Sequence, residues 1–159
     1  TNVRFVLPET RPLEQAPLTA SRQDAPAAAL QGPILLVEDE PEVRKVVRMQ
    51  LTALGHAVIE AGDGVEALAL LESIDDIAVL ISDTVMPGGL NGRELAQRAR
   101  ALRPALPILL VTGYASEQPV SDDAVADVPV LRKPFDPPAL AAALASLTLT
   151  DPTTEPSAT

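Results

Sequence analysis

The chain lacks cysteine and tryptophan altogether, and its 159 residues include one histidine and 12 basic against 22 acidic side chains. Without cysteine, neither a disulfide framework nor a thiolate zinc site can form, and a single His56 cannot build a histidine-rich metal centre. We interpret His56 as a surface residue of a short loop rather than as a phosphoacceptor. The formal charge of -10 disfavours nucleic acid and anionic membranes as partners, because both attract clustered Lys and Arg.

Long apolar runs are also missing. No run approaches the roughly 20 residues that span a bilayer, and the N-terminal residues lack the basic-then-apolar layout of a signal peptide. We therefore expect a soluble, cytoplasmic chain without direct membrane contact. Because only three residues are aromatic while 47% are hydrophobic, the core is predicted to consist of Val, Leu, Ile and Ala.

Proline marks the borders of the folded part. Five of the 16 prolines lie in the first 33 residues and two lie in the last nine. Both stretches have little periodic apolar pattern, so we predict a linker at 10–33 and a disordered tail at 149–159. Residues 34–148 between them have a usual size for one compact domain.

Within 34–148, apolar runs of strand length alternate with helical patterns. Strands are predicted at 34–37, 57–61, 77–82, 107–111 and 128–131, and helices at 41–54, 63–74, 91–102, 116–127 and 140–147. The expected apolar faces of the first three helices include Val46, Val65 and Leu102. Five strand–helix units in sequence imply right-handed crossovers and a doubly wound α/β fold, with a parallel sheet covered by helices on both faces.

Polar residues follow four of the five predicted strands: Glu38 and Asp39 the first, Asp83 the third, Thr112 the fourth and Lys133 the fifth. Ligands of open parallel sheets bind beyond these carboxyl ends. Three carboxylates without His or Cys favour Mg²⁺, which also takes phosphate oxygens. Asp83 is then a candidate nucleophile that forms an acyl phosphate. Thr112 could donate its hydroxyl, and Lys133 is a compact cation suited to a phosphoryl oxygen.

Each of these residues, taken alone, also has a purely structural interpretation. The acids before Pro41 suit a helix N-cap and first turn, Asp83 suits a loop, Thr112 a turn and Lys133 the surface. Their joint arrangement at the strand ends favours the chemical interpretation. The chain has only two lysines, Lys45 and Lys133, so a lysine at a strand end strengthens it.

Four sequence blocks resemble the receiver domains of two-component signalling: Ile34-Leu35-Leu36-Val37-Glu38-Asp39, Ser82-Asp83-Thr84-Val85-Met86-Pro87, Val111-Thr112-Gly113-Tyr114 and Lys133-Pro134-Phe135. The steps from Asp39 to Asp83, on to Thr112 and on to Lys133 are 44, 29 and 21 residues, which agree with that family. The resemblance covers 34–148 and implies a five-stranded, flavodoxin-like receiver fold.

The resemblance implies that Asp83 accepts a phosphoryl group from a phosphohistidine. Mg²⁺ would be held by Asp39, Asp83 and the backbone carbonyl of Val85, and Glu38 would help through water. In this sequence Glu38 stands where the family more often has Asp. The longer side chain is expected to shift the water network of the site.

The same resemblance assigns the phosphoryl oxygens to Thr112 and Lys133, with the backbone amides of Thr84 and Gly113 as further donors. Charge that develops during transfer would meet fixed cations and dipoles. Many receivers carry a Phe or Tyr, whose rotation reports phosphorylation, three residues before the lysine. This chain has Val130 at that position.

Tyr114 is a candidate substitute for that missing aromatic, and Thr-Gly-Tyr itself resembles receivers attached to hybrid kinases. The implied partner is the dimerisation domain of a histidine kinase, which bears the phosphohistidine, in the same or a partner chain. A histidine phosphotransfer protein is a second candidate partner. Its helical pair is expected to dock on the first helix, around Val43, Arg44 and Val47.

Residues 1–9 resemble the last strand of a histidine-kinase ATP-binding domain, because Val3, Phe5 and Leu7 alternate before Pro8. With a receiver downstream, and no output domain expected after Thr148, this favours the C-terminal receiver of a hybrid histidine kinase that can be membrane-anchored. The domain itself would phosphorylate and slowly dephosphorylate itself rather than turn over a substrate.

Two alternatives belong to other functional classes. One is a phosphatase or phosphotransferase with an Asp nucleophile, which usually has a second carboxylate two residues on, where this chain has Val85. The other is a receiver-like interaction module that is never phosphorylated. The intact set of Asp39, Asp83, Thr112 and Lys133 argues against the second alternative.

Overall fold

The computed structural model describes residues 30–113 and 125–148. Along the chain the elements are β1 (Ile34–Val37), α1 (Pro41–Ala53), β2 (Val58–Ala61), α2 (Gly64–Ser73), β3 (Val79–Asp83), α3 (Gly92–Leu102), β4 (Ile108–Thr112), β5 (Val130–Arg132) and α4 (Pro137–Thr148). The strands pair in parallel in the order β2-β1-β3-β4-β5. This is the predicted doubly wound α/β fold, with β1 and β3 adjacent where the strand order reverses.

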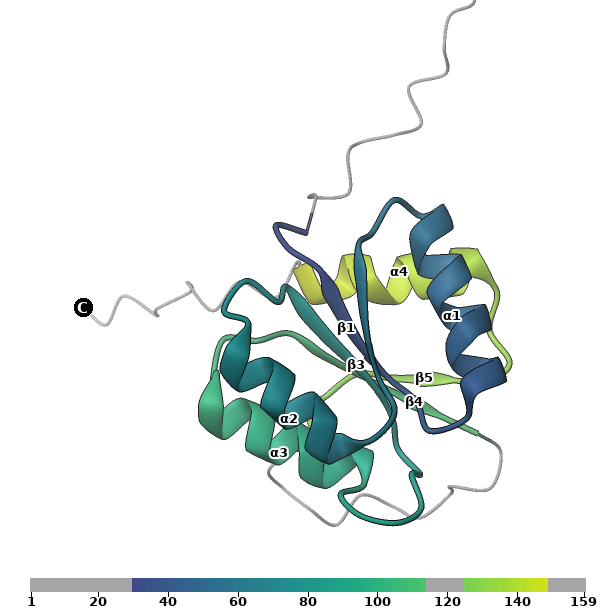
Figure 1. The fold of residues 1–159 in the computed structure, drawn as a ribbon. Coiled ribbons are helices and arrows are strands. Elements are labelled where there is room, and N and C mark those ends of the chain that lie inside the picture. Colours follow the sequence, from purple (N-terminus) through teal and green to yellow (C-terminus); the bar gives the residue numbers. More distant parts are fainter. Residues whose placement is uncertain (1–29, 114–124, 149–159) are drawn as a thin grey trace, which may run out of the picture.

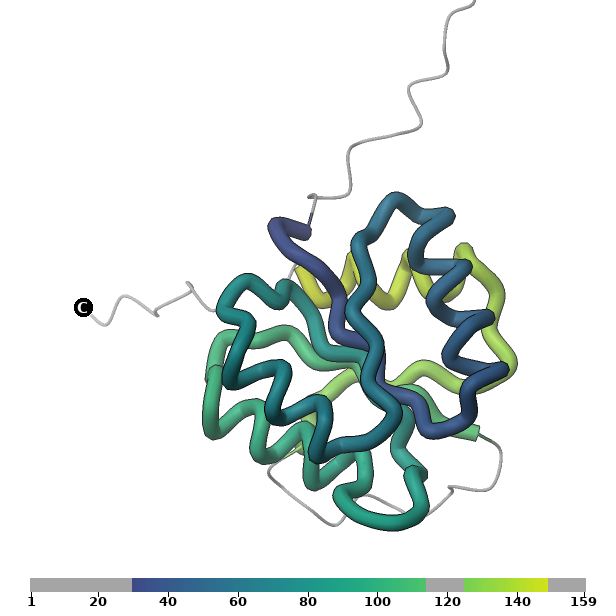
Figure 2. Tube along the Cα trace, in the orientation of Figure 1, coloured from purple at the N-terminus to yellow at the C-terminus, as the bar shows by residue number. Residues whose placement is uncertain are grey.

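Helices cover both faces of the sheet, α1 and α4 on one side and α2 and α3 on the other (Figures 1 and 2). Side chains of a strand point alternately to opposite faces, so Leu35 and Val37 pack toward α2 and α3, while Ile34 and Leu36 pack toward α1 and α4. All four residues of β1 are buried. The unbroken apolar run of β1 is therefore explained by its place inside a sheet that is covered on both faces.

Local sequence signals set several helix ends as predicted. Pro41 is the first residue of α1, and Gly55, just after the C-cap, has φ +91°. Asp63 accepts a hydrogen bond from the Glu66 amide at 2.8 Å. At α3, Asn91 and Glu94 form the predicted capping box, in which the side chain of each accepts from the amide of the other.

Strand ends differ from the prediction by one or two residues, because backbone pairing rather than hydrophobicity decides them. β3 and β4 extend through Asp83 and Thr112, which continue the ladder. β5 begins at Val130 rather than Val128, since the Val128 amide bonds the local Val125 carbonyl. The predicted helix at 116–127 lies outside the described residues except for its last three, which form a turn.

Three apolar side chains expected on the core faces of their helices are exposed instead: Val46, Val65 and Leu102. α2, for example, buries Ala67 and Leu71. One helix turn contains 3.6 residues, so Val65 lies on a different face from these two. The sequence contained more apolar positions than the sheet contacts can cover.

Residues 30–33, which precede the predicted boundary of the domain, also contact the fold. Leu30 packs against the core beside α1 and α4, and the Pro33 carbonyl accepts a hydrogen bond from Ala78 at 2.9 Å. The predicted upstream strand at 1–9, most of the predicted linker and the predicted tail at 149–159 lie outside the described residues. Within 30–113 and 125–148, every helix is too short or too polar to cross a membrane.

Candidate functional site

Three carboxylates meet at the carboxyl ends of β1 and β3. Val37 pairs with Ser82, so the residues that follow them, Glu38 and Asp83, lie side by side on neighbouring strands. One carboxylate oxygen from each of Glu38, Asp39 and Asp83 lies within 4.8 Å of the other two. These hard oxygen donors, without His or Cys, suit Mg²⁺. The predicted convergence of the three acids is thus present in the fold.

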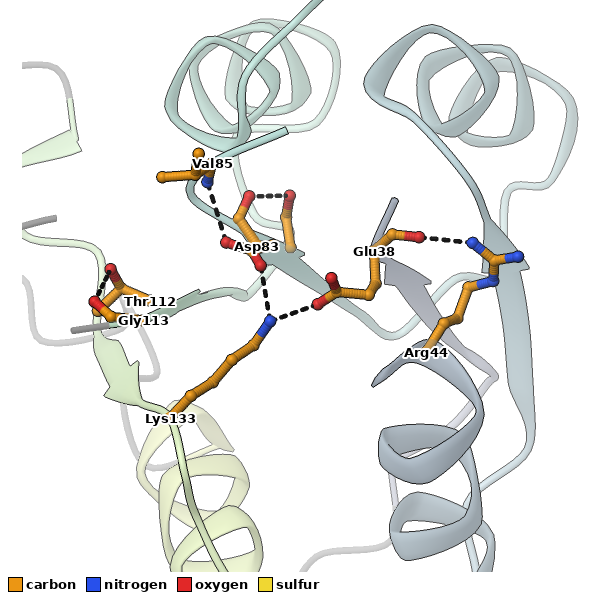
Figure 3. A network of polar contacts seen from close by, with 8 residues as sticks. Glu38, Arg44, Asp83, Val85, Thr112, Gly113 and Lys133 are labelled. Atoms are coloured by element: carbon orange, nitrogen blue, oxygen red, sulfur yellow. Dashed lines mark hydrogen bonds and ion pairs between the residues drawn. The ribbon is translucent and has the colours of Figure 1, made fainter. Parts of the chain in front are cut away.

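Lys133 is the cation of this cluster. Its Nζ donates to Glu38 Oε2 and to Asp83 Oδ2, each at 2.6 Å (Figure 3). The Lys133 amide donates to the Thr112 carbonyl at 2.7 Å, which fixes the start of its side chain beside the end of β4. The ammonium therefore bridges two acids that lie 95 and 50 residues earlier in the chain.

Burial and charge have opposite effects on the pKa values of Glu38 and Lys133. Only 4% of Glu38 is exposed, and this burial raises the pKa of Glu38 above its usual range, although Lys133 opposes the shift. Burial acts to lower the pKa of Lys133, but its hydrogen bonds and attraction to Asp83 and Glu38 prevail and raise it. Lys133 is consequently charged at neutral pH, and its charge favours the ionised form of Glu38.

The second oxygen of Asp83 accepts a hydrogen bond from the Val85 amide at 2.9 Å. The prediction assigned the Thr84 amide to an incoming phosphoryl oxygen; in this structure that amide donates to the Val111 carbonyl at 2.8 Å. The reason is geometric, because Thr84 continues the β3–β4 ladder. Among the described residues, the buried Thr84 hydroxyl has no hydrogen-bond partner.

Thr112 is the last residue of β4, and its hydroxyl donates to the adjacent Gly113 carbonyl at 3.3 Å. In Figure 3 these two residues lie apart from the lysine and the acids. Val130 is half exposed on β5, and Tyr114, its suggested substitute, lies outside the described residues. The structure thus gathers Glu38, Asp83 and Lys133 tightly and leaves the Thr112 hydroxyl at the margin.

The three residues of α1 that were predicted to dock the partner are not among its exposed ones. Val47 is only 5% exposed and belongs to the core, and Val43 packs against that core. The Arg44 guanidinium donates to the Glu38 carbonyl at 2.6 Å. The prediction treated α1 as a partner face without knowing which of its sides the sheet would cover.

The exposed part of α1 borders a groove next to the segment after β5. Val46 and Met49 are its large exposed apolar side chains. The groove has a volume of about 330 Å³, and its walls include Glu42, Val43, Val46, Gln50, Pro134 and Phe135. An apolar surface of α1 therefore adjoins the acidic cluster, and two of the predicted docking residues, Val43 and Val47, line the groove.

Sequence reasoning missed Gly92, the first residue of α3. A Cβ at this position would lie 1.8 Å from the Asp83 carbonyl oxygen and 3.0 Å from Ser82 Oγ. Only glycine lets the start of α3 approach the backbone of the candidate nucleophile so closely. The available signal was the glycine itself, because glycine is a poor helix former and its presence at a helix start suggests a close backbone contact.

Taken together, fold and site define a doubly wound α/β protein with an acidic, lysine-bearing pocket at the switch point of its sheet. The chain belongs to the response regulator receiver domain family, whose sequence model matches residues 34–145. It is therefore a receiver domain of two-component systems, and the family expected from the four sequence blocks is confirmed.

Similar proteins support this family assignment. A CheY homolog, a chemotaxis protein of Campylobacter jejuni, is 39% identical over 111 residues, which cover 67% of this chain and 85% of the relative. The sensor kinase CckA of Brucella abortus is 34% identical over 124 residues, which cover 74% of this chain but only 13% of that kinase. The chain thus resembles both a free-standing receiver and part of a much longer kinase.

Solved structures show the same fold. A receiver protein from Sinorhizobium medicae superposes with a TM-score of 0.68 at 28% identity, over 75% of this chain and 95% of that one. The receiver domain of the hybrid histidine kinase CckA gives a TM-score of 0.60 at 38% identity, over 73% and 98% of the two chains. The receiver fold predicted from sequence is confirmed.

Proposed function

We propose that Asp83 is the phosphoacceptor of this receiver. The observation that carries the proposal is the convergence of three carboxylates within 4.8 Å of one another, with Lys133 bonded to Asp83 itself. In the transfer, an Asp83 carboxylate oxygen bonds to phosphorus while the bond between phosphorus and the donor's imidazole nitrogen breaks. The imidazole leaves with the electron pair, and Asp83 becomes an acyl phosphate.

Asp39, Asp83 and the Val85 carbonyl are the proposed Mg²⁺ ligands, with Glu38 acting through water. Bound Mg²⁺ supplies positive charge beside the transferred phosphoryl oxygens. The three acids are the hard donors that this ion prefers. Lys133 holds Glu38 and Asp83 by one oxygen each, so these side chains already point into a common space.

Lys133 is also the proposed cation for the incoming phosphoryl group. Since its pKa is raised, it keeps its charge at neutral pH and can meet charge that develops on phosphoryl oxygens. The Thr112 hydroxyl and the Gly113 amide are proposed as additional donors. The Val85 amide, which already contacts Asp83, takes the place first given to Thr84.

The proposed donor is a histidine-kinase domain bearing a phosphohistidine, in the same or a partner chain and in the cytoplasm. The likeness to part of the sensor kinase CckA favours a receiver that belongs to a hybrid kinase. Such a receiver either passes its phosphoryl group to a histidine phosphotransfer protein or holds the kinase core in check, and it hydrolyses the acyl phosphate slowly.

The groove beside α1 is the proposed docking surface for the donor's helices. Exposed Val46 lines it, and so does Lys133 of the acidic cluster. Val46→Asp should slow transfer from a phosphorylated kinase domain and leave phosphorylation by acetyl phosphate unchanged. Val65→Asp is the matched control, because Val65 is equally an exposed valine but lies on α2. Equal rates for both variants would contradict this surface.

Mass spectrometry after acetyl phosphate treatment with Mg²⁺ tests the central proposal. We expect one base-labile phosphoryl group that is lost in Asp83→Asn and retained in Asp76→Asn, an exposed acid away from the site. The absence of any adduct on Asp83 would refute the proposal and favour the interaction module that is never phosphorylated. The phosphatase alternative is not favoured, since Val85 replaces its second carboxylate.

A further inference from the structure

Arg44 connects three elements next to the acidic cluster. Its NH1 donates to the Glu38 carbonyl at 2.6 Å, and its Nε lies 3.7 Å from Glu60 Oε1 on β2. Figure 3 shows the guanidinium directed at the backbone of Glu38 rather than outward from α1. The side chain is mostly buried, with 22% exposed. Arg44 thus links α1 and β2 to the end of β1.

The carbonyl that Arg44 holds belongs to the peptide unit between two of the three acids. A peptide unit is planar and includes both flanking Cα atoms, so its orientation governs how the Glu38 and Asp39 side chains leave the backbone. On its other side, the Glu38 amide donates to the Ala61 carbonyl at 3.2 Å. Beyond that bond the chain leaves the sheet, and Arg44 restrains the first peptide after it.

We propose that Arg44 is a positioning residue for the Mg²⁺ site, acting through the Glu38–Asp39 peptide, rather than a docking residue. The inference rests on the proposed function, because it concerns the same Mg²⁺ site. The forked guanidinium contacts the Glu38 carbonyl and the Glu60 carboxylate at the same time, a geometry for which a lysine ammonium is less suited. Arg48 is a natural comparison, since it lies on the same helix and its Nε forms an ion pair with Glu60 Oε2 at 3.4 Å.

Calorimetric titration of the full chain with Mg²⁺ tests the proposal. Arg44→Ala should raise the Mg²⁺ dissociation constant roughly tenfold, the lower end for residues that orient metal ligands. Arg48→Ala removes the same charge from the same helix and should leave that constant within about twofold of the wild type, as a solvated surface charge does. Arg44→Lys should recover part of the affinity.

Phosphorylation by acetyl phosphate across Mg²⁺ concentrations gives the second measurement. Arg44→Ala should need more Mg²⁺ for half-maximal rate while reaching the wild-type maximum. In buffer without Mg²⁺, the amides of Asp39 and Glu40 should also exchange hydrogen faster than in Arg48→Ala. A merely structural role for Arg44 would lower the melting temperature without moving the Mg²⁺ dependence.

Equal Mg²⁺ affinities of the Arg44→Ala and Arg48→Ala variants would overturn the proposal. So would a defect confined to transfer from a kinase, which would make Arg44 a docking residue after all. Should Arg44→Ala fail to fold, Arg44→Lys must still bind Mg²⁺ more weakly than the wild type, or the proposal falls. If the wild type itself binds no Mg²⁺, the proposed function fails first, which separates the two failures.

Discussion

Replacing Lys133 with methionine would leave two buried carboxylates without their cation while keeping a side chain of similar length. Lys133 Nζ donates to Glu38 and Asp83 at 2.6 Å each, and these acid side chains are 5% and 11% exposed. Charge-assisted hydrogen bonds to buried groups are the strong ones. The substitution therefore removes the interaction that lets these acids share one pocket.

The expected cost follows from burial. Removing one partner of a buried ion pair costs roughly 3–5 kcal/mol. Lys133 itself is 23% exposed, so water and protonation of one acid offset part of the loss, and we expect the lower end, about 3 kcal/mol. In a domain of this size, about 1 kcal/mol corresponds to roughly 4 °C, so the melting temperature should fall by about 12 °C.

The loss should depend on pH through Glu38. Burial raises the pKa of this carboxyl and Lys133 opposes the rise, so without Lys133 the pKa rises further. A carboxyl with a raised folded-state pKa stabilises the fold below its ordinary value of 4.5 and loses that contribution as pH rises through the folded pKa. The destabilisation should be largest near neutral pH and should shrink toward that value.

Thermal melts in chelator-containing buffer, at about pH 7 and about pH 5, measure both effects. Lys45→Met is the matched control, since the chain's only other lysine is exposed on α1 and should leave the melting temperature unchanged. Mg²⁺ should restore part of the stability that Lys133→Met loses. A variant that melts with the wild type near neutral pH would refute the reasoning.

Three further predictions concern the scaffold and the ion. Gly92→Ala should displace or unfold the start of α3, because its Cβ would lie 1.8 Å from the Asp83 carbonyl oxygen, whereas a Cβ at Gly89 would meet nothing within 4 Å. Near-ultraviolet circular dichroism and thermal melts compare Gly92→Ala with the control Gly89→Ala. A Gly92→Ala variant with unchanged structure and stability would contradict this packing. Leu80→Ala empties a fully buried position and should cost roughly 2–5 kcal/mol in urea unfolding, against little for exposed Val65→Ala. Millimolar Mg²⁺ should raise the wild-type melting temperature by relieving repulsion among the three carboxylates, and no shift would argue against a shared ion.

Local patterns carried much of the fold. The apolar run of β1 indicated a strand covered on both faces, and the Asn91–Glu94 pair set the start of α3. These features are readable because capping and strand burial depend on residues close together in sequence. Which face of a helix would pack on the sheet was harder to predict from sequence, since a helix such as α1 has more apolar positions than the sheet covers. Val46 is exposed, for example, while Val47 is buried.

For the site, the sequence by itself determined which chemistry is available: acids after β1 and β3, and a lysine after β5, at the spacings of a receiver. Tertiary structure alone decided how they are used. It bonded Lys133 to both Glu38 and Asp83 and turned the Arg44 guanidinium inward. It also engaged the Thr84 amide in the sheet. The physical reason is that hydrogen bonds between distant segments depend on strand register and helix packing, which no local pattern encodes.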